Sequence, residues 1–322
     1  MYIKMGIPKL NNLLLDKCSQ KSINKIHLES LFKKKIAVDI SIYLYRFLGD
    51  DNFMEHVYLF LSLFKYYCIE PIFIFDGKPP VEKTATIQKR NIEKQTAKQE
   101  YIELEGLLKV ETKPYEKREI EKRMESLKKK MIRVKWEHID KAIELIQAFG
   151  FSYYLAPHEA DQLCVHLSKI GRVYAVMSDD MDMIISGCSH VIRNLNMSTH
   201  EVMMYNNDEI LQDLNISLEN FRQIVILSGT DYHTDRSQSI SIKRAFELYK
   251  EYQSTDQSNT LYEWLLSYDV IPDNFIDIYN LFESDNYQDT LNTFLEAAPP
   301  SSKKMSVSTI KSIMCPYRFI FL

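Results

Sequence analysis

Three acidic residues, Asp179, Asp180 and Asp182, stand within four positions of the stretch "VMSDDMDMIISG", directly after an apolar run. Carboxylates this close repel one another and raise each other's pKa unless a positive charge lies between them. One interpretation is an acidic surface turn. The other is a metal site, which requires further ligands from distant parts of the chain.

Two other acids, Asp39 and Asp76, end apolar runs in the same way, after "KKIAV" and "EPIFIF". Ligands of open α/β sheets bind beyond the carboxyl ends of the parallel strands, so acids at neighbouring strand ends converge there. A single acid at a strand end often only shapes a turn. Three such strand ends favour a metal site.

Three more acids extend the candidate set. Glu159 and Asp161 fall in the first turn of a predicted helix, whose N-terminus favours their ionised form. Asp231 lies in "LSGTDYH", after an apolar helix. Carboxylate oxygens suit Mg²⁺ or Mn²⁺ better than softer metals. Two such ions about 4 Å apart can stabilise the attacking and leaving oxygens of a phosphodiester displacement.

The elements expected to position these acids alternate between strand and helix. Near-continuous apolar runs, typical of strands buried on both faces of a parallel sheet, occupy residues 34–39, 70–76 and 172–179. Helical patterns occupy residues 53–68, 140–150 and 156–171. This alternation predicts an open α/β sheet flanked by helices.

The charge is unevenly distributed along the 322 residues. Residues 83–135 hold 16 Lys and Arg against 9 Asp and Glu, a net charge of +7, while the remainder carries −11. The pattern there is long and helical, with an interruption near "ETKPYEK". A solvated helical hairpin is the ordinary interpretation of such a charge run. A basic arm beside an acidic centre also suits the handling of a polyanion.

The composition indicates an intracellular protein. The five cysteines are scattered without a CxxC pair, which argues against a disulfide framework and a zinc site. The N-terminal stretch lacks the apolar core of a signal peptide, and the most apolar window is interrupted by Lys65, Glu70 and Pro71. We expect a monomer in the nucleus, in the cytoplasm or at a viral replication site.

Six motifs, in order over residues 5–252, resemble those of the structure-specific 5′ nucleases, the flap endonuclease and XPG family. They are "MGIPKLNNLL", "VDISIYLYRFL", "FDGKPP", "APHEADQLC", "SDDMDMI" and "LSGTDYH". One such motif is weak, but six in order are specific. The resemblance implies a PIN-like parallel or mixed sheet flanked by helices, with a helical arch inserted and a C-terminal helix-turn-helix region.

The resemblance also implies the metal ligands, with two Mg²⁺ ions for which Mn²⁺ can substitute. They are Asp39, Asp76, Glu159, Asp161, Asp180, Asp182 and Asp231. Asp76 and Asp161 would dominate one ion, and Asp180 and Asp182 the second. Asp179 matches an acidic position of the family that is not a ligand.

Two basic residues, Lys83 and Arg90, match the family's catalytic pair on the first helix of the arch. Seven residues are nearly two helical turns, so both side chains point the same way, about 10 Å apart. They could offset charge at the scissile phosphate. Tyr45 matches an aromatic that stacks on a base, although an aromatic on such a helix is more often part of the core.

The duplex-binding turn departs from the family pattern. Where the family has a glycine-rich turn, this chain has "SISIKRA", with Ser239, Ser241, Lys243 and Arg244 as the candidate DNA-binding residues. Without glycines, the backbone loses its easy close approach to phosphate. The potassium-assisted duplex contact of the family therefore becomes an open question here.

The expected layout follows the motifs. Residues 5–82 form an N-terminal nuclease region, 83–135 the arch, 136–212 an internal nuclease region, 213–252 the helix-turn-helix and 253–322 a C-terminal helical region and tail. The stretch "PPSSKKMSVSTIKS" is predicted to be a flexible polar link. The final "CPYRFIFL" lacks a convincing sliding-clamp motif and could form a packing strand or a truncated partner-binding end.

These features predict a divalent-metal-dependent 5′ nuclease that cuts branched DNA, such as a 5′ flap, near the junction of single strand and duplex. Its expected partners are such DNA and replication proteins, without a membrane. Two alternatives stay open: a 5′-to-3′ exonuclease of the same fold acting on DNA or RNA, and a non-catalytic scaffold that binds nucleic acid or a protein.

Overall fold

The computed structural model describes residue 7 and residues 9–50, 52–78, 84–110, 113–233, 239–283, 288–297, 304–317 and 319. Within these residues one mixed sheet holds the strands β1 (Ile23–His27), β2 (Lys35–Asp39), β3 (Glu70–Phe75), β4 (Ser152–Leu155), β5 (Ala175–Met177), β6 (His190–Asn196) and β7 (Glu201–Asn206). Their spatial order is β1-β7-β6-β5-β2-β3-β4.

The centre of the sheet is parallel, because β6, β5, β2, β3 and β4 all run in one direction. The antiparallel strands β7 and β1 extend one side of it. The prediction of a parallel or mixed α/β sheet is confirmed. The strand predicted at 172–179 is shorter, because the chain turns into the acidic stretch after Met177.

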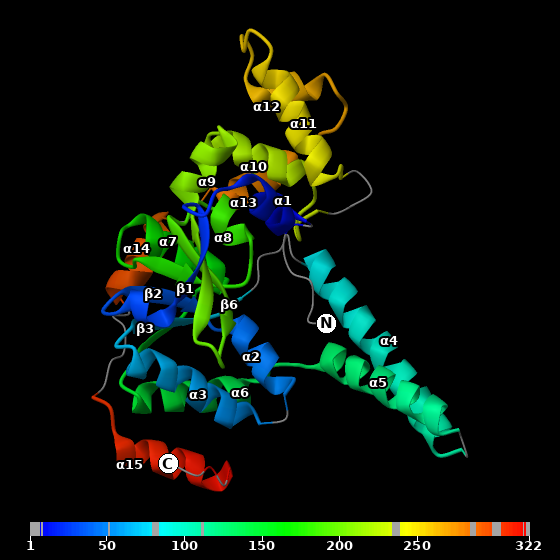
Figure 1. Ribbon diagram of the computed structural model, residues 1–322, viewed down its shortest axis with the longest axis vertical. Helices are drawn as coiled ribbons and strands as arrows, with labels where there is room; N and C mark the ends of the chain where they lie inside the picture. Colours follow the sequence, from blue (N-terminus) through cyan, green and yellow to red (C-terminus); the bar gives the residue numbers. More distant parts are fainter. Residues whose placement is uncertain are drawn as a thin grey trace.

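Helices cover both faces of this sheet (Figure 1). Those of the nuclease body are α1 (Leu10–Lys17), α2 (Ser41–Leu48), α3 (Phe53–Tyr66), α6 (Trp136–Ala148), α7 (Ala160–Lys169), α8 (Asp182–Ile185) and α9 (Asn207–Leu214). Successive residues of β2 alternate between two cores: Ile36 and Val38 pack with α2, α3 and α6, whereas Ala37 packs with α7 and α8. This is the three-layer arrangement that buries a parallel sheet on both faces.

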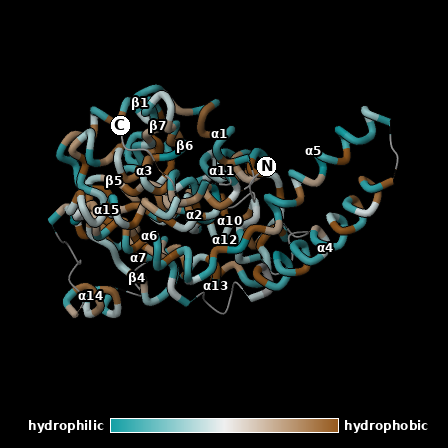
Figure 2. Tube along the Cα trace, turned by 90° about the horizontal axis from the view of Figure 1, so that it is seen from below, coloured by the Kyte–Doolittle hydropathy of each residue, from teal (hydrophilic) through white to brown (hydrophobic). Residues whose placement is uncertain are grey.

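The arch is a helical hairpin of α4 (Thr84–Leu108) and α5 (Pro114–Met131). It projects from the body in Figure 1 and again in Figure 2, where most of its length is hydrophilic. The predicted interruption near residues 111–117 is confirmed, since α5 starts with a proline at its first position, where a helix tolerates the missing N–H.

The C-terminal part is helical, as predicted. It contains α10 (Leu218–Leu227), α11 (Ile242–Gln253), α12 (Leu261–Leu266), α13 (Phe275–Phe282), α14 (Gln288–Ala297) and α15 (Val307–Met314). Helix α10 ends before "SISIKRA", and α11 begins within it, at Ile242.

One prediction for the C-terminal end is wrong. Part of the predicted flexible link forms α15, whose Ile310 and Met314 are buried in the core beside α6. The backbone N–H of Ser306 also donates to the Ala148 carbonyl at 2.9 Å. Cys315–Tyr317 form a 3-10 turn, and most of the "RFIFL" that follows lies outside the described residues. No helix among the described residues is long and apolar enough to cross a membrane.

Candidate functional site

The carboxyl ends of β5, β2 and β3 lie side by side, and each leads into a candidate acid. Asp39 is the last residue of β2, and Asp76 follows β3 directly. Ser178, which follows β5, donates a hydrogen bond from its hydroxyl to Asp39 Oδ2 at 3.0 Å. The strand ends therefore bring together residues that are 139 positions apart in the chain.

The N-terminus of α7 is attached to the same edge. The backbone N–H of Ala160 donates to Asp76 Oδ1 at 2.9 Å. Glu159 and Asp161 flank this residue, so the hydrogen bond places both acids beside the end of β3. The N–H of Gly77 donates to the His158 carbonyl at 2.6 Å, which closes the loop before α7 against the loop after β3.

The carboxylates of the site lie close enough to raise one another's pKa. Burial raises the pKa of Asp39 well above its ordinary value, and the negative charges of Asp76, Asp161 and Asp180 raise it further. Burial and the charges of Asp161 and Glu159 likewise raise the pKa of the Tyr232 phenol. Like charges so arranged favour a cation among them.

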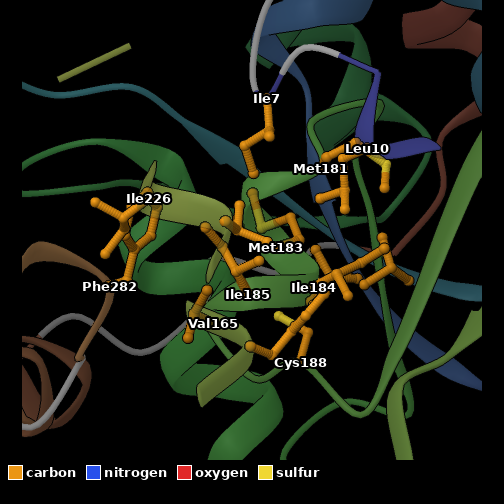
Figure 3. Close-up of a cluster of buried hydrophobic side chains, with 14 of the residues drawn as sticks. Ile7, Leu10, Val165, Met181, Met183, Ile184, Ile185, Cys188, Ile226 and Phe282 are labelled. Atoms are coloured by element: carbon orange, nitrogen blue, oxygen red, sulfur yellow. The ribbon is translucent and has the colours of Figure 1, made fainter. Parts of the chain in front are cut away.

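Two buried methionines fix the acidic stretch 179–182 on its core side. Met181 and Met183 are buried and alternate with the acids, and Figure 3 places both among Leu10, Ile184 and Ile185. Ser178 Oγ accepts a hydrogen bond from the N–H of Asp180 at 3.3 Å, and Asp180 Oδ1 accepts one from the N–H of Asp182 at 3.1 Å. Asp182 is only 5% exposed.

Asp231 joins the body to the arch. Its Oδ2 accepts a hydrogen bond from Arg90 Nη2 on α4 at 2.7 Å. The turn before it requires Gly229, whose φ of +92° lies in the region that favours glycine. The Arg90 guanidinium thus reaches an acid of the site from the base of the arch. Lys83 lies outside the described residues.

Tyr45 lies between the acids and the arch. Lys94 Nζ on α4 is 5.5 Å from the centre of its ring. Burial and the charge of Asp76 raise the pKa of Tyr45, whereas the nearby Arg90 lowers it. The core position on α2 is instead taken by Tyr43, which is 1% exposed. Tyr45 is therefore a partly exposed ring beside the acids, whereas Tyr43 belongs to the core.

The arch has a small apolar contact of its own. Ala97, Met124 and Leu127 are buried between α4 and α5. Arg123 donates from Nε and Nη2 to both carboxylate oxygens of Glu100, at 2.6 and 2.9 Å. These contacts hold the two helices together. The lysines at the end of α5, Lys128, Lys129 and Lys130, add to the positive charge of the arch.

The four candidate DNA-binding residues near α11 have different surroundings. Ser241 caps the helix, its Oγ accepting a hydrogen bond from the N–H of Arg244 at 3.2 Å. The Arg244 guanidinium contacts Glu251 at 2.9 Å and Glu247 at 3.6 Å on its own helix. Ser239 packs against Gly229, and Lys243 is exposed. Unlike the Arg244 guanidinium, the Lys243 side chain has no ion pair among the contacts described above.

The donor chemistry of the site fits a hard divalent cation. Its side chains offer carboxylate oxygens, the ligands that Mg²⁺ prefers. In the described ranges no group of three or more His, Cys, Asp or Glu side chains is arranged to hold a metal ion directly. The carboxylates of Asp39, Asp76 and Asp180 turn to local hydrogen bonds, the expected result of mutual repulsion.

Sequence reasoning missed Ser178 and Tyr232. Ser178 is fully buried and links the ends of β2 and β5. The Tyr232 hydroxyl donates to Glu159 Oε2 at 3.4 Å. Both lie inside motifs quoted above, but a single chain gives no sign that a hydroxyl next to an acid serves the same site.

A mixed α/β sheet with acids at its parallel strand ends, beside a basic helical hairpin, defines the PIN-like fold. Residues 5–97 match the XPG N-terminal domain, and residues 150–231 match the XPG I-region. Flap endonuclease 1 of Drosophila mojavensis is 32% identical over 312 residues, covering 91% of this chain and 74% of that protein. The chain belongs to the flap endonuclease and XPG family of structure-specific 5′ nucleases.

Solved structures share the fold. The catalytic core of Rad2 in complex with a DNA substrate aligns with a TM-score of 0.66 and 21% identity, covering 97% of this chain and 95% of that one. The Holliday junction-resolving enzyme GEN1, in complex with product DNA and a Mg²⁺ ion, aligns with a TM-score of 0.58 and 18% identity, covering 92% and 72%.

Proposed function

We propose that this protein hydrolyses phosphodiester bonds of DNA with a 5′ single-stranded flap, next to the junction with the duplex. The observation that supports this best is the convergence of acids from three strand ends and from the tip of α7, together with the bond between Arg90 of the arch and Asp231 in the turn after α10. Such a reaction requires acidic side chains that can hold metal ions and a positively charged side chain that can contact the phosphate.

The proposed cofactor is a pair of Mg²⁺ ions. Asp39, Asp76, Glu159 and Asp161 would hold one, and Asp180 and Asp182 the other, with Asp161 shared and Asp231 acting through water. Bound there, the ions would polarise the phosphate and lower the pKa of a coordinated water. The GEN1 complex with Mg²⁺ supports this choice of metal.

The other roles belong to side chains of the arch and of α2. Lys83 and Arg90 would lie against the scissile phosphate and offset its charge. Tyr45 would stack on a base beside the cut. The net positive arch would attract the single strand by its phosphates, and Lys243 would contact the duplex.

Cleavage of labelled DNA tests the proposal. Purified protein with Mg²⁺ should cut a 5′-flap duplex within a few nucleotides of the junction, and a chelator should stop the reaction. A panel of flapped, nicked, blunt and RNA substrates separates a flap endonuclease from an exonuclease by product length. Folded protein that leaves every branched substrate intact in both Mg²⁺ and Mn²⁺ contradicts the proposal and favours a binding scaffold.

Arg90→Gln should lower the cleavage rate constant by about a hundredfold, the effect of removing one charge-stabilising donor. Because the turn that carries Asp231 does not depend on Arg90 for its backbone conformation, we expect the melting temperature to change little. We also expect little change in DNA affinity. Single-turnover cleavage at saturating enzyme measures the effect.

Arg172→Gln is the matched control for Arg90→Gln. Arg172 is exposed and precedes β5, at the end of the strand opposite the acids. Arg172→Gln removes the same charge, but from a side chain that does not reach the site. Equal rate constants for wild type and Arg90→Gln would remove Arg90 from the reaction.

A further inference from the structure

Asp179, the first acid of the acidic stretch, faces away from the other carboxylates. Its Oδ2 accepts a hydrogen bond from Arg46 Nη2, and its Oδ1 accepts one from the N–H of Asn194 at 2.7 Å. Both oxygens are therefore used by the protein. The Asp179 side chain is 13% exposed and that of Arg46 30%, so solvent screens this ion pair less than a surface pair.

The backbone of the same residue is held by a second arginine. Arg193 of β6 donates from Nε and Nη2 to the Asp179 carbonyl, at 3.1 and 2.6 Å. Arg193 is itself fixed, because its Nη1 donates to Asn11 Oδ1 at 3.1 Å and its guanidinium lies 5.4 Å from the Tyr205 ring. Two arginines from two elements thus hold one residue by its side chain and its carbonyl.

Arg46 is fixed in turn by its own helix. Its guanidinium lies 5.4 Å from the ring of the buried Tyr43. Its neighbour on α2 is Tyr45, which lies beside Asp76 and Lys94. One helix therefore carries both the aromatic proposed to stack on DNA and the arginine that holds the acidic stretch.

We infer that Arg46, Asp179 and Arg193 are positioning residues that orient Asp180 and Asp182 for the second divalent ion. Asp179, which the two arginines hold, lies immediately before Asp180. The buried Met181 and Met183 fix the same stretch from the core side. Because the Arg46 guanidinium balances the charge of Asp179, this carboxylate repels Asp180 and Asp182 less. This inference rests on the proposed function.

The expected size of the effect follows from residues that orient metal ligands in other proteins, whose loss lowers metal affinity by about 10–100-fold. Arg46→Gln should weaken Mg²⁺ binding within that range, and so should Asp179→Asn, which keeps the shape of the side chain. Arg46→Lys keeps the charge but loses the fixed guanidinium geometry, so its affinity should be intermediate.

The experiment titrates the protein with Mg²⁺ alone, in the absence of DNA, by calorimetry and by the metal-dependent rise of the melting temperature. Because both residues act through one contact, Arg46→Gln/Asp179→Asn should bind Mg²⁺ no more weakly than the weaker single variant. Glu201→Gln is the matched control: it breaks the exposed Lys25–Glu201 pair of 3.4 Å and should leave the Mg²⁺ affinity unchanged.

Unchanged Mg²⁺ affinity in folded Arg46→Gln and Asp179→Asn overturns the inference, and so do fully additive losses in the double variant. Flap cleavage measured in parallel separates the two proposals. Wild type that binds Mg²⁺ but cuts no branched DNA overturns the proposed function, while the titration still decides the positioning role. Cleavage by Arg46→Gln that recovers at high Mg²⁺ supports both.

Discussion

Asp182→Asn should abolish flap cleavage, with a loss of at least about a thousandfold, while DNA affinity stays close to that of wild type. The side chain is buried at the end of the acidic stretch, in the electrostatic environment of Tyr232. Asparagine keeps its size but not its charge, so the proposed second ion would lose one of its two principal ligands. A single charge-stabilising donor already accounts for about 10²–10³ in rate in other enzymes.

Single-turnover cleavage and binding of a labelled flap in Ca²⁺ measure the two quantities separately. Asp208→Asn is the control, because Asp208 is an exposed acid in the first turn of α9 and loses the same charge. Cleavage by Asp182→Asn at more than a tenth of the wild-type rate would remove this residue from the metal site.

Gly77→Ala should destabilise the fold by about 3 kcal/mol, at the upper end of what overpacking costs, and should impair the site at the same time. An added Cβ would lie 2.0 Å from the Ala156 carbonyl oxygen and 2.8 Å from that of His158. Both obstacles are backbone atoms, so the loop before α7 must move. Glu159 and Asp161 follow that loop directly, so their place beside Asp76 is lost with it.

Thermal and denaturant unfolding measure the loss, and a fall in melting temperature of at least about 5 °C is expected. Gly106→Ala is the matched control. No atom lies within 4 Å of a Cβ at Gly106 in α4, so alanine there should stabilise the helix by about 0.5–1 kcal/mol. Equal melting temperatures for Gly77→Ala and wild type would show that the two loops are not in tight contact.

Local pattern was enough to predict the elements that carry the site. Apolar runs ending in acid predicted β2, β3 and β5, because strands buried on both faces need continuous apolar sequence. The break at Pro114 predicted the two helices of the arch. The strands β1, β4, β6 and β7 were missed. The edge strands β1 ("INKIH") and β4 ("SYYL") are short and carry little apolar pattern, and β6 ("HVIRNLN") and β7 ("EVMMYN") interrupt their apolar residues with polar ones.

Helix α15 was missed for a related reason. Its sequence, "VSTIKSIM", is polar enough to suggest a link, and only Ile310 and Met314 are deeply buried. What makes it a helix is the apolar surface of α6 that these two side chains cover. Such support comes from a distant part of the chain, and periodicity within eight residues does not reveal it.

By itself, the sequence determined which side chains can meet at the site, because strand ends and helix tips follow from local pattern and place their acids at one edge. Only the tertiary structure decided which partner each one takes. Arg46 holds Asp179, whereas Arg90 reaches Asp231, although nothing local separates these two arginines. Hydrogen bonds and ion pairs act through space over a few ångströms, and the packing of α2 and α4 on the sheet sets those distances.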